Sequence, residues 1–226
     1  MSAPLSPSAR EPLFSQEVWC RAEPVLEAVH AHPFLRSLLD GTLPRERFDA
    51  YMAQDAVYLG RYGRALARLA SMTHDPDELV LWDDAARTAI VTERLLHADH
   101  VDVAAAVEPS PTCLAYTDFI DASALSGSYG VAVAAVLPCF LVYEAVGLRL
   151  LDEACGLAGH PYGDWIATYG DEAFSESCSR ARAVMDAAAA RAGAAEREAM
   201  SETFLRACRY EWMFWDAAWR GEDWPV

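Results

Sequence analysis

The first group of residues that could do chemistry is an aromatic stripe. Tyr51, Asp55, Tyr58 and Tyr62 recur at helical intervals. This spacing places three phenols and one carboxylate on a single helix face. One interpretation is a half-buried tyrosine face in which Asp55 bonds a neighbouring phenol. The other is the wall of a pocket for a flat, nitrogen-bearing heterocycle.

A second group surrounds a cysteine. Cys139 directly follows Pro138 and precedes Tyr143 by four residues, so the thiol and the phenol share one helix face. Pro138 removes one backbone hydrogen bond and predicts a kink near Cys139. A lone cysteine in an apolar helix is usually inert packing. The kink and the neighbouring phenol favour a nucleophile as the alternative.

A third group sets one carboxylate among large rings. Glu211, Phe214 and Trp215 lie on one face of a helical segment. Burial there would raise the pKa of Glu211 and make it a proton donor. A surface ion pair with a partner such as Arg209 is the alternative.

A fourth group has the spacing of metal ligands. Glu93, His97 and His100 follow one another at helical intervals, as in carboxylate-bridged dimetal sites. A salt-bridged helix face explains the same pattern. No HExxH, GxSxG, phosphate-loop or dinucleotide motif occurs.

The elements that must position these groups have helical periodicity nearly throughout. We expect an all-α fold with one domain over residues 13–226, after a loose segment 1–12, because strand patterns bounded by hairpin turns are missing. His32-Pro33-Phe34 should end a first helix. The expected helices cover about residues 14–31, 44–72, 129–155, 171–191 and 195–220, with further ones starting near 76 and 111.

Capping residues support these boundaries. Asp75 and Glu78 have capping-box spacing, in which Asp75 accepts from the first turn and Glu78 reaches back to the cap. Ser110 precedes Pro111 in a second cap-then-proline start, and Gly221 should close the last helix.

The composition limits the classes of partner. The chain has 226 residues, 53% of them hydrophobic, so a full core is expected without disulfide or metal support. A net charge of −16 argues against binding to nucleic acid or anionic membranes. The chain contains no lysine, which excludes Schiff-base catalysis and a phosphate-loop lysine.

The location is expected to be cytoplasmic. Residues 1–11 lack the apolar core of a secretory signal. The most apolar stretch, residues 129–146, contains Pro138 and ends near Glu144, which favours a buried helix over a membrane span. Six scattered cysteines without a CxxC pair predict free thiols in a reducing compartment.

Several short segments together carry a family resemblance. In order, the chain contains His32-Pro33-Phe34, Gly41-Thr42-Leu43, Phe48-x2-Tyr51-x2-Gln54-Asp55-x2-Tyr58-Leu59, Pro109-Ser110-Pro111-Thr112-x3-Tyr116, Leu137-Pro138-Cys139-x3-Tyr143-Glu144-x-Val146-Gly147, Trp165-Ile166-x2-Tyr169-Gly170 and Tyr210-Glu211-x2-Phe214-Trp215-x2-Ala218. Each segment is weak alone, but their order and spacing resemble the TenA family, also called thiaminase II, over about residues 13–225.

The resemblance implies a heme-oxygenase-like helical bundle without heme, assembled as a homotetramer or dimer. It implies an aminopyrimidine aminohydrolase of thiamin salvage that needs no cofactor or metal. The implied reaction hydrolyses 4-amino-5-aminomethyl-2-methylpyrimidine to the hydroxymethylpyrimidine and ammonia. Thiamin itself and a formylated precursor are further candidate substrates.

The resemblance also implies residue roles. Cys139 matches the family's nucleophile, which puts the chain in the cysteine-bearing branch, and Glu211 matches its acid. Matches to residues that contact substrate or line the site are Asp55, Tyr58, Tyr116, Tyr143, Tyr169 and Phe214, with Tyr58 placed to tune the thiol.

Two alternatives remain from the sequence. A heme-oxygenase-like dimetal oxidase would use Glu93, His100 and Glu144, but it needs a late His-x3-Asp-x2-His helix. This chain has Phe174-x3-Cys178-x2-Ala181 at about that place. A non-catalytic regulatory protein is the other alternative, and the acidic charge argues against direct DNA binding.

Overall fold

The computed structural model describes residues 12–98, 107–154 and 156–226, except for the side chains of residues 92–98. Within these ranges the chain forms helices and no strands, which confirms the all-α prediction. The helices are α1 (Phe14–His30), α2 (Pro33–Leu39), α3 (Arg45–Met72), α4 (Pro76–Ala98), α5 (Pro111–Ala124), α6 (Tyr129–Glu153), α7 (Gly163–Tyr169), α8 (Glu172–Arg191) and α9 (Ala194–Arg220). The expected division at residue 12 stays a prediction, since residues 1–11 lie outside the described part.

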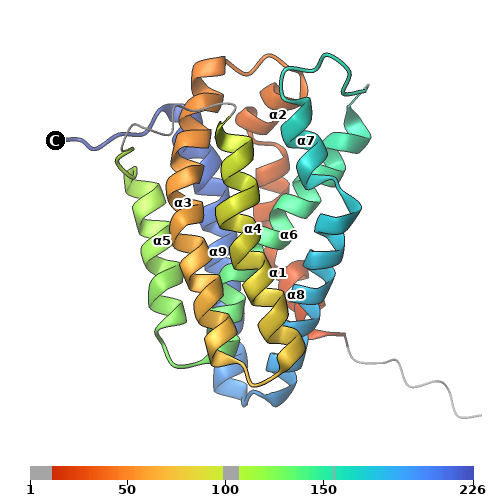
Figure 1. Cartoon of the computed structure of the whole chain (residues 1–226), viewed down its shortest axis with the longest axis vertical. Helices are drawn as coiled ribbons and strands as arrows, with labels where there is room; N and C mark the ends of the chain where they lie inside the picture. Colours follow the sequence, from red (N-terminus) through yellow and green to blue (C-terminus); the bar gives the residue numbers. More distant parts are fainter. Residues whose placement is uncertain (1–11, 99–106, 155) are drawn as a thin grey trace, which may run out of the picture.

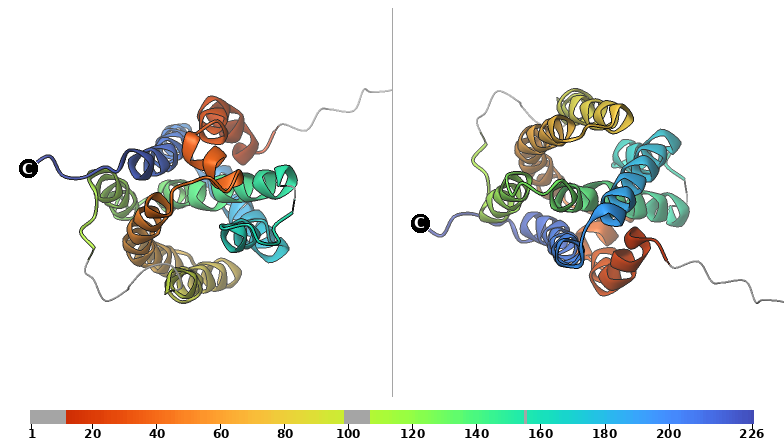
Figure 2. Two further views of the ribbon diagram at one scale, coloured as in Figure 1. Left: turned by 90° about the horizontal axis from the view of Figure 1, so that it is seen from above. Right: turned by 90° about the horizontal axis from the view of Figure 1, so that it is seen from below.

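The helices pack around α6, which contacts α3, α5, α7, α8 and α9 (Figure 1). Both end-on views place α3 and α4 on one side of α6, with α1 and α9 on the other (Figure 2). Helix α8 lies beside α6 and also contacts α4. The core is therefore built around a single central helix.

Helix α6 is apolar because it is buried. Among the described residues it is the one helix long and apolar enough to cross a membrane, with a mean hydropathy of 2.1. However, 72% of that apolar window is buried inside the fold, as expected of a core helix. The helix continues through Pro138 to Glu153.

Two short helices were not expected. His32-Pro33-Phe34 ends α1 but also starts α2, because the His32 Nδ1 accepts a hydrogen bond from the Phe34 amide at 3.2 Å and Pro33 occupies the tolerated first turn. Helix α7 follows Tyr162 and buries Trp165, Ile166 and Tyr169. It is held by this packing, since so short a helix is unstable alone.

The predicted caps are confirmed except for one half of the capping box. Ser110 accepts from the Cys113 amide, and Gly221 closes α9 in the left-handed region at φ 65°. Asp75 accepts from the Glu78 amide at 3.2 Å, but Glu78 does not reach back. Its carboxylate instead accepts from the hydroxyls of Thr73 and Tyr129, because the half-buried Tyr129 needs a partner there.

Candidate active site

A cavity of about 170 Å³ lies between α3 and α4 on one side and α6 and α8 on the other. Helix α7 contributes Tyr169 to its wall. Water occupies roughly 30 Å³ per molecule, so the cavity has room for a small heterocycle. Its wall combines aromatic rings, aliphatic side chains and a few polar groups, as ligand sites do.

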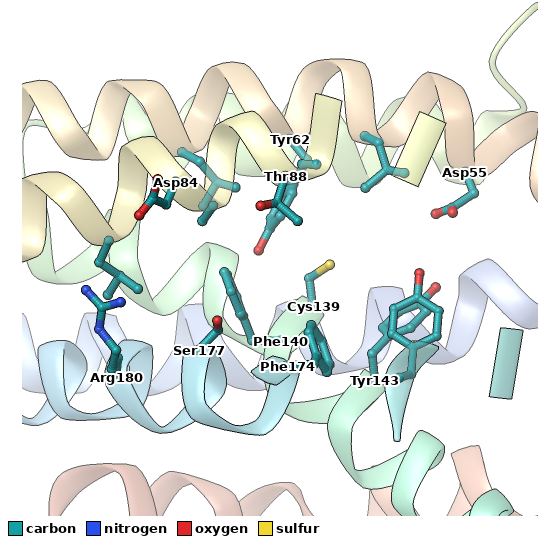
Figure 3. A pocket seen from close by; sticks show the side chains of 16 residues that line it. Asp55, Tyr62, Asp84, Thr88, Cys139, Phe140, Tyr143, Phe174, Ser177 and Arg180 are labelled. Atoms are coloured by element: carbon teal, nitrogen blue, oxygen red, sulfur yellow. The ribbon is translucent and has the colours of Figure 1, made fainter. Parts of the chain in front are cut away.

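Four of the predicted site residues line this cavity. They are Asp55, Cys139, Tyr143 and Tyr169, which come from α3, α6 and α7 (Figure 3). Asp55 is 4% exposed, whereas Cys139 is half-buried with its sulfur beside the cavity. The spacing argument thus correctly placed the thiol of Cys139 and the phenol of Tyr143 on one face.

The aromatic stripe of α3 divides between the cavity wall and the packing around it. Tyr62 lines the cavity, although it was not among the expected substrate contacts; its place in the stripe was the signal for it. Its hydroxyl donates to the Val136 carbonyl at 2.9 Å. Tyr51 lies deeper, and its hydroxyl is 2.9 Å from that of Tyr143. These bonds fix the rings that face the cavity.

The other four predicted residues pack together and are not among the residues that line the cavity. Tyr58 lies between Tyr116 and Phe214, with ring centroids 5.1 and 5.6 Å away. The hydroxyl of Tyr116 donates to Glu211 Oε1 at 2.6 Å. All four side chains are nearly inaccessible to solvent. They form a buried aromatic layer around one carboxyl group.

Burial dominates the protonation of Glu211. The side chain is 2% exposed, and loss of hydration raises its pKa from 4.5 to about 8. The hydrogen bond from Tyr116 opposes this shift, while the nearby charge of Asp55 adds to it. Burial therefore favours the protonated form of Glu211 near neutral pH. The buried position of Glu211 also argues against the surface ion pair with Arg209.

The phenols around the thiol also stay protonated. Burial raises the pKa of Tyr58, Tyr62 and Tyr116 well above 10, and negative charge on the nearby Cys139 and Glu211 side chains raises each of them further. The hydroxyl of Tyr58 makes no hydrogen bond of normal geometry within the described residues.

Five cysteines lie in the described part of the chain, and all are free thiols, as expected. Cys113, Cys178 and Cys208 are buried away from the cavity wall. Burial raises the pKa of Cys113 to about 12 and shifts the other two thiols in the same direction. Of the described cysteines, Cys139 alone lines the cavity.

The metal hypothesis concerns residues that lie mostly outside the described part of the chain. The side chains of Glu93 and His97, and all of His100, lie outside the described part. Among the described residues no three His, Cys, Asp or Glu side chains are grouped to hold an ion. Glu144 pairs instead with Arg182, at 3.4 Å.

The sequence reading missed the polar residues at one end of the cavity. Asp84 and Thr88 come from α4, while Ser177 and Arg180 come from α8. They alternate with apolar positions on amphipathic helices, a pattern that is equally typical of a solvated surface. No signal in the sequence distinguished them.

The sequence model of the TENA/THI-4/PQQC family matches residues 19–221. A relative from Bacillus subtilis strain 168, named aminopyrimidine aminohydrolase, is 33% identical over 93% of this chain and 92% of its own length. The thiamine biosynthesis multifunctional protein ThiED of Corynebacterium glutamicum is 37% identical over 92% of this chain. The chain spans 27% of that longer protein.

Solved structures agree with the fold. A TenA homologue from P. horikoshii OT3 superposes with a TM-score of 0.83 at 27% identity, covering 93% of this chain and all of that one. A domain from Shewanella denitrificans with a heme oxygenase-like fold superposes with a TM-score of 0.66 over 91% of this chain and 92% of that one. At 12% identity the second match shows the fold alone. The expected heme-oxygenase-like bundle is confirmed, and the chain belongs to the TENA/THI-4/PQQC family.

Proposed function

We propose that this protein is a hydrolase of thiamin metabolism that replaces the C5-methylene substituent of an aminopyrimidine with a hydroxyl group. The substrate we favour is 4-amino-5-aminomethyl-2-methylpyrimidine, which would give the hydroxymethylpyrimidine and ammonia. The name of the 33% identical relative, aminopyrimidine aminohydrolase, supports this choice. So does a cavity walled by phenols and one carboxylate.

The single observation that carries the proposal is a thiol on the cavity wall with a buried acid of raised pKa in the layer next to it. Cys139 lines the cavity, and its neighbour Tyr116 donates to the buried Glu211. A nucleophile at the cavity and a proton donor in the adjoining buried layer are the two groups that this displacement requires.

Covalent catalysis makes the displacement easier. The ring is electron-poor and ammonia leaves badly, so direct attack at the methylene is slow. When the Cys139 thiolate adds to ring C6, the ring becomes an electron-rich enamine that expels the protonated amino group of the C5 substituent as ammonia. Water then adds to the exocyclic methylene and releases one proton to solvent, and the thiolate departs from C6. One difficult step is thus divided into two easier ones.

Glu211 is the proposed general acid. It protonates a ring nitrogen as the thiolate adds to C6, and it takes the proton back when the thiolate leaves. A positioned acid of this kind contributes roughly 10²–10⁴-fold to the rate. The Tyr116 hydroxyl orients the carboxyl group through its 2.6 Å hydrogen bond.

The remaining predicted residues are assigned to binding. Asp55 would accept from the 4-amino group of the pyrimidine, a charge-assisted hydrogen bond. Tyr143 and Tyr169 lie 4.8 Å apart by ring centroids on the cavity wall and would contact the ring. Tyr58 and Phe214 would support the site from behind, with the charge of the thiolate felt by the nearby Tyr58 phenol.

Ammonia release tests the proposal directly. The purified chain is incubated with the aminomethylpyrimidine, and separately with thiamin, while ammonia and the hydroxymethylpyrimidine are quantified. Equal amounts of both products from the aminomethylpyrimidine would support the assignment. No hydroxymethylpyrimidine from either compound would overturn it. A homotetramer or dimer and a cytoplasmic location stay predictions, as does the absence of a metal or cofactor.

A further inference from the structure

The cavity is longer than one pyrimidine ring. Along α3 its wall runs from Asp55 through Leu59 and Tyr62 to Leu66, eleven residues further on. At about 1.5 Å per residue this stripe spans roughly 16 Å. A substrate held near Asp55 therefore leaves the other end of the cavity unfilled.

The two ends of the cavity differ in chemistry. Asp55 and Tyr143 lie at one end, Asp84 and Arg180 lie on opposite walls at the other, and Cys139 lies between them (Figure 3). Asp84, Thr88 and Arg180 are exposed, so this outer end opens to solvent. A leaving group can extend into it beyond the enclosed space.

A short substituent does not reach the outer end. On α8, Phe174 lies below Cys139, and Arg180 follows it by six residues (Figure 3). That separation corresponds to roughly 9 Å along the helix axis. An aminomethyl group ends well before Arg180, whereas a second ring with a polar tail spans this distance.

Asp84 and Arg180, at the outer end of the cavity, determine which polar group at the end of the C5 substituent can bind there. Within the described part of the chain, neither Asp84 nor Arg180 has a hydrogen-bond or ion-pair partner, although their charges are opposite. A hydroxyl group suits both, because it donates to a carboxylate and accepts from a guanidinium. A phosphate would pair with Arg180 but would be repelled by Asp84.

We propose that Asp84 and Arg180 form a leaving-group subsite that favours substrates whose C5 substituent is a second ring ending in a hydroxyl over their phosphorylated forms. Ser177 lies on the same wall as Arg180 and adds a further hydroxyl to the subsite. This inference rests on the proposed function and assigns the substrate preference of the same site.

The test compares three substrates on four proteins. Thiamin supplies the second ring with a hydroxyl tail, thiamin monophosphate supplies the phosphorylated tail, and the aminomethylpyrimidine supplies the short substituent. The proteins are the wild type, Asp84→Asn, Arg180→Gln and the control Asp83→Asn. Asp83 is an exposed acid next to Asp84 that does not line the cavity. The measured quantity is kcat/KM for each protein with each substrate.

Opposite shifts are expected from the two charges. Asp84→Asn should raise the ratio of kcat/KM for thiamin monophosphate to that for thiamin by about fivefold, and Arg180→Gln should lower it by a similar factor. Both shifts should shrink in about 1 M salt, because the outer end is solvated. Asp83→Asn should leave the ratio at its wild-type value.

Two results would overturn the subsite. One is a change of the ratio in the same direction for Asp84→Asn and Arg180→Gln; the other is a change no larger than that of Asp83→Asn. Turnover of the aminomethylpyrimidine separates this failure from failure of the proposed function. If the wild type hydrolyses the short substrate but never thiamin or its phosphate, the enzyme assignment stands and the subsite is wrong.

Discussion

Replacement of Gly147 by alanine should separate α6 from the end of α7 and displace Tyr169 from the cavity wall. A Cβ atom on Gly147 would lie 2.4 Å from both the carbonyl carbon and oxygen of Tyr169. Ordinary van der Waals contact begins at 3.4 Å, so the backbone of Tyr169 must move by 3.4 − 2.4 = 1.0 Å. Backbone atoms cannot avoid the clash by changing rotamer.

The magnitude follows from two opposing effects. Overpacking a closed contact costs typically 1–3 kcal/mol. Alanine regains about 1 kcal/mol because it favours the helix more than glycine does. We therefore expect Gly147→Ala to lower the free energy of unfolding by up to about 2 kcal/mol. In a domain of this size that lowers Tm by up to roughly 8 °C.

Gly60→Ala is the matched control, because a Cβ there meets nothing within 4 Å. It should raise Tm, since only the helix preference changes. Thermal unfolding of both variants gives the stability difference, and steady-state kinetics should show a KM raised about tenfold or more in Gly147→Ala alone. A Gly147→Ala protein that melts as high as Gly60→Ala and keeps the wild-type KM would contradict this reasoning. It would show that the close contact with Gly147 does not set the position of Tyr169 in the cavity wall.

The remaining predictions concern the proposed chemistry. Asp55→Asn should weaken binding by roughly 2–4 kcal/mol, seen mostly as a raised KM, because an amide donor then faces the substrate's amino group. Glu211→Gln should lower kcat by about 10²–10⁴-fold with little change in KM; the reverse pattern in these two variants would exchange their roles. Because Glu211 has a pKa of about 8, kcat/KM of the wild type should fall above that pH as the acid is lost. A folded-state pKa above the unfolded value of 4.5 also means that stability falls as pH rises from about 5 to 8, and Glu211→Gln should abolish this slope in urea titrations. Elemental analysis should find no stoichiometric metal, and chelators should leave activity unchanged; two bound iron or manganese ions per chain would favour the dimetal oxidase.

The long helices could be predicted from the sequence because each carries an amphipathic or apolar pattern over many turns. Helix α3 was expected at residues 44–72 and is observed at Arg45–Met72. The two short helices could not be predicted in this way. The segment His32-Pro33 predicts the end of one helix. That it also begins the next helix depends on the hydrogen bond that the His32 ring accepts from the Phe34 amide.

Residues of the candidate site were predictable where spacing and family resemblance agreed. Cys139 and Tyr143 share a helix face, and both line the cavity. Spacing along one helix did not reveal which side chains from different helices meet. The separation of the cavity wall from the layer that holds Tyr116 and Glu211 is set by how α3, α5, α6 and α9 pack. For the same reason the sequence did not show that Asp84 and Arg180 share one cavity.

Covalent catalysis by Cys139 is tested most directly by the rate of ammonia release from the aminomethylpyrimidine in the Cys139→Ser variant. Cys20→Ser is the matched control, because Cys20 is an exposed free thiol away from the cavity. A serine hydroxyl is not ionised near neutral pH without a strong base, so Cys139→Ser should fold normally and lose most turnover. Cys20→Ser should keep the wild-type rate. A Cys139→Ser protein that retains more than about a tenth of the wild-type kcat would contradict the covalent mechanism.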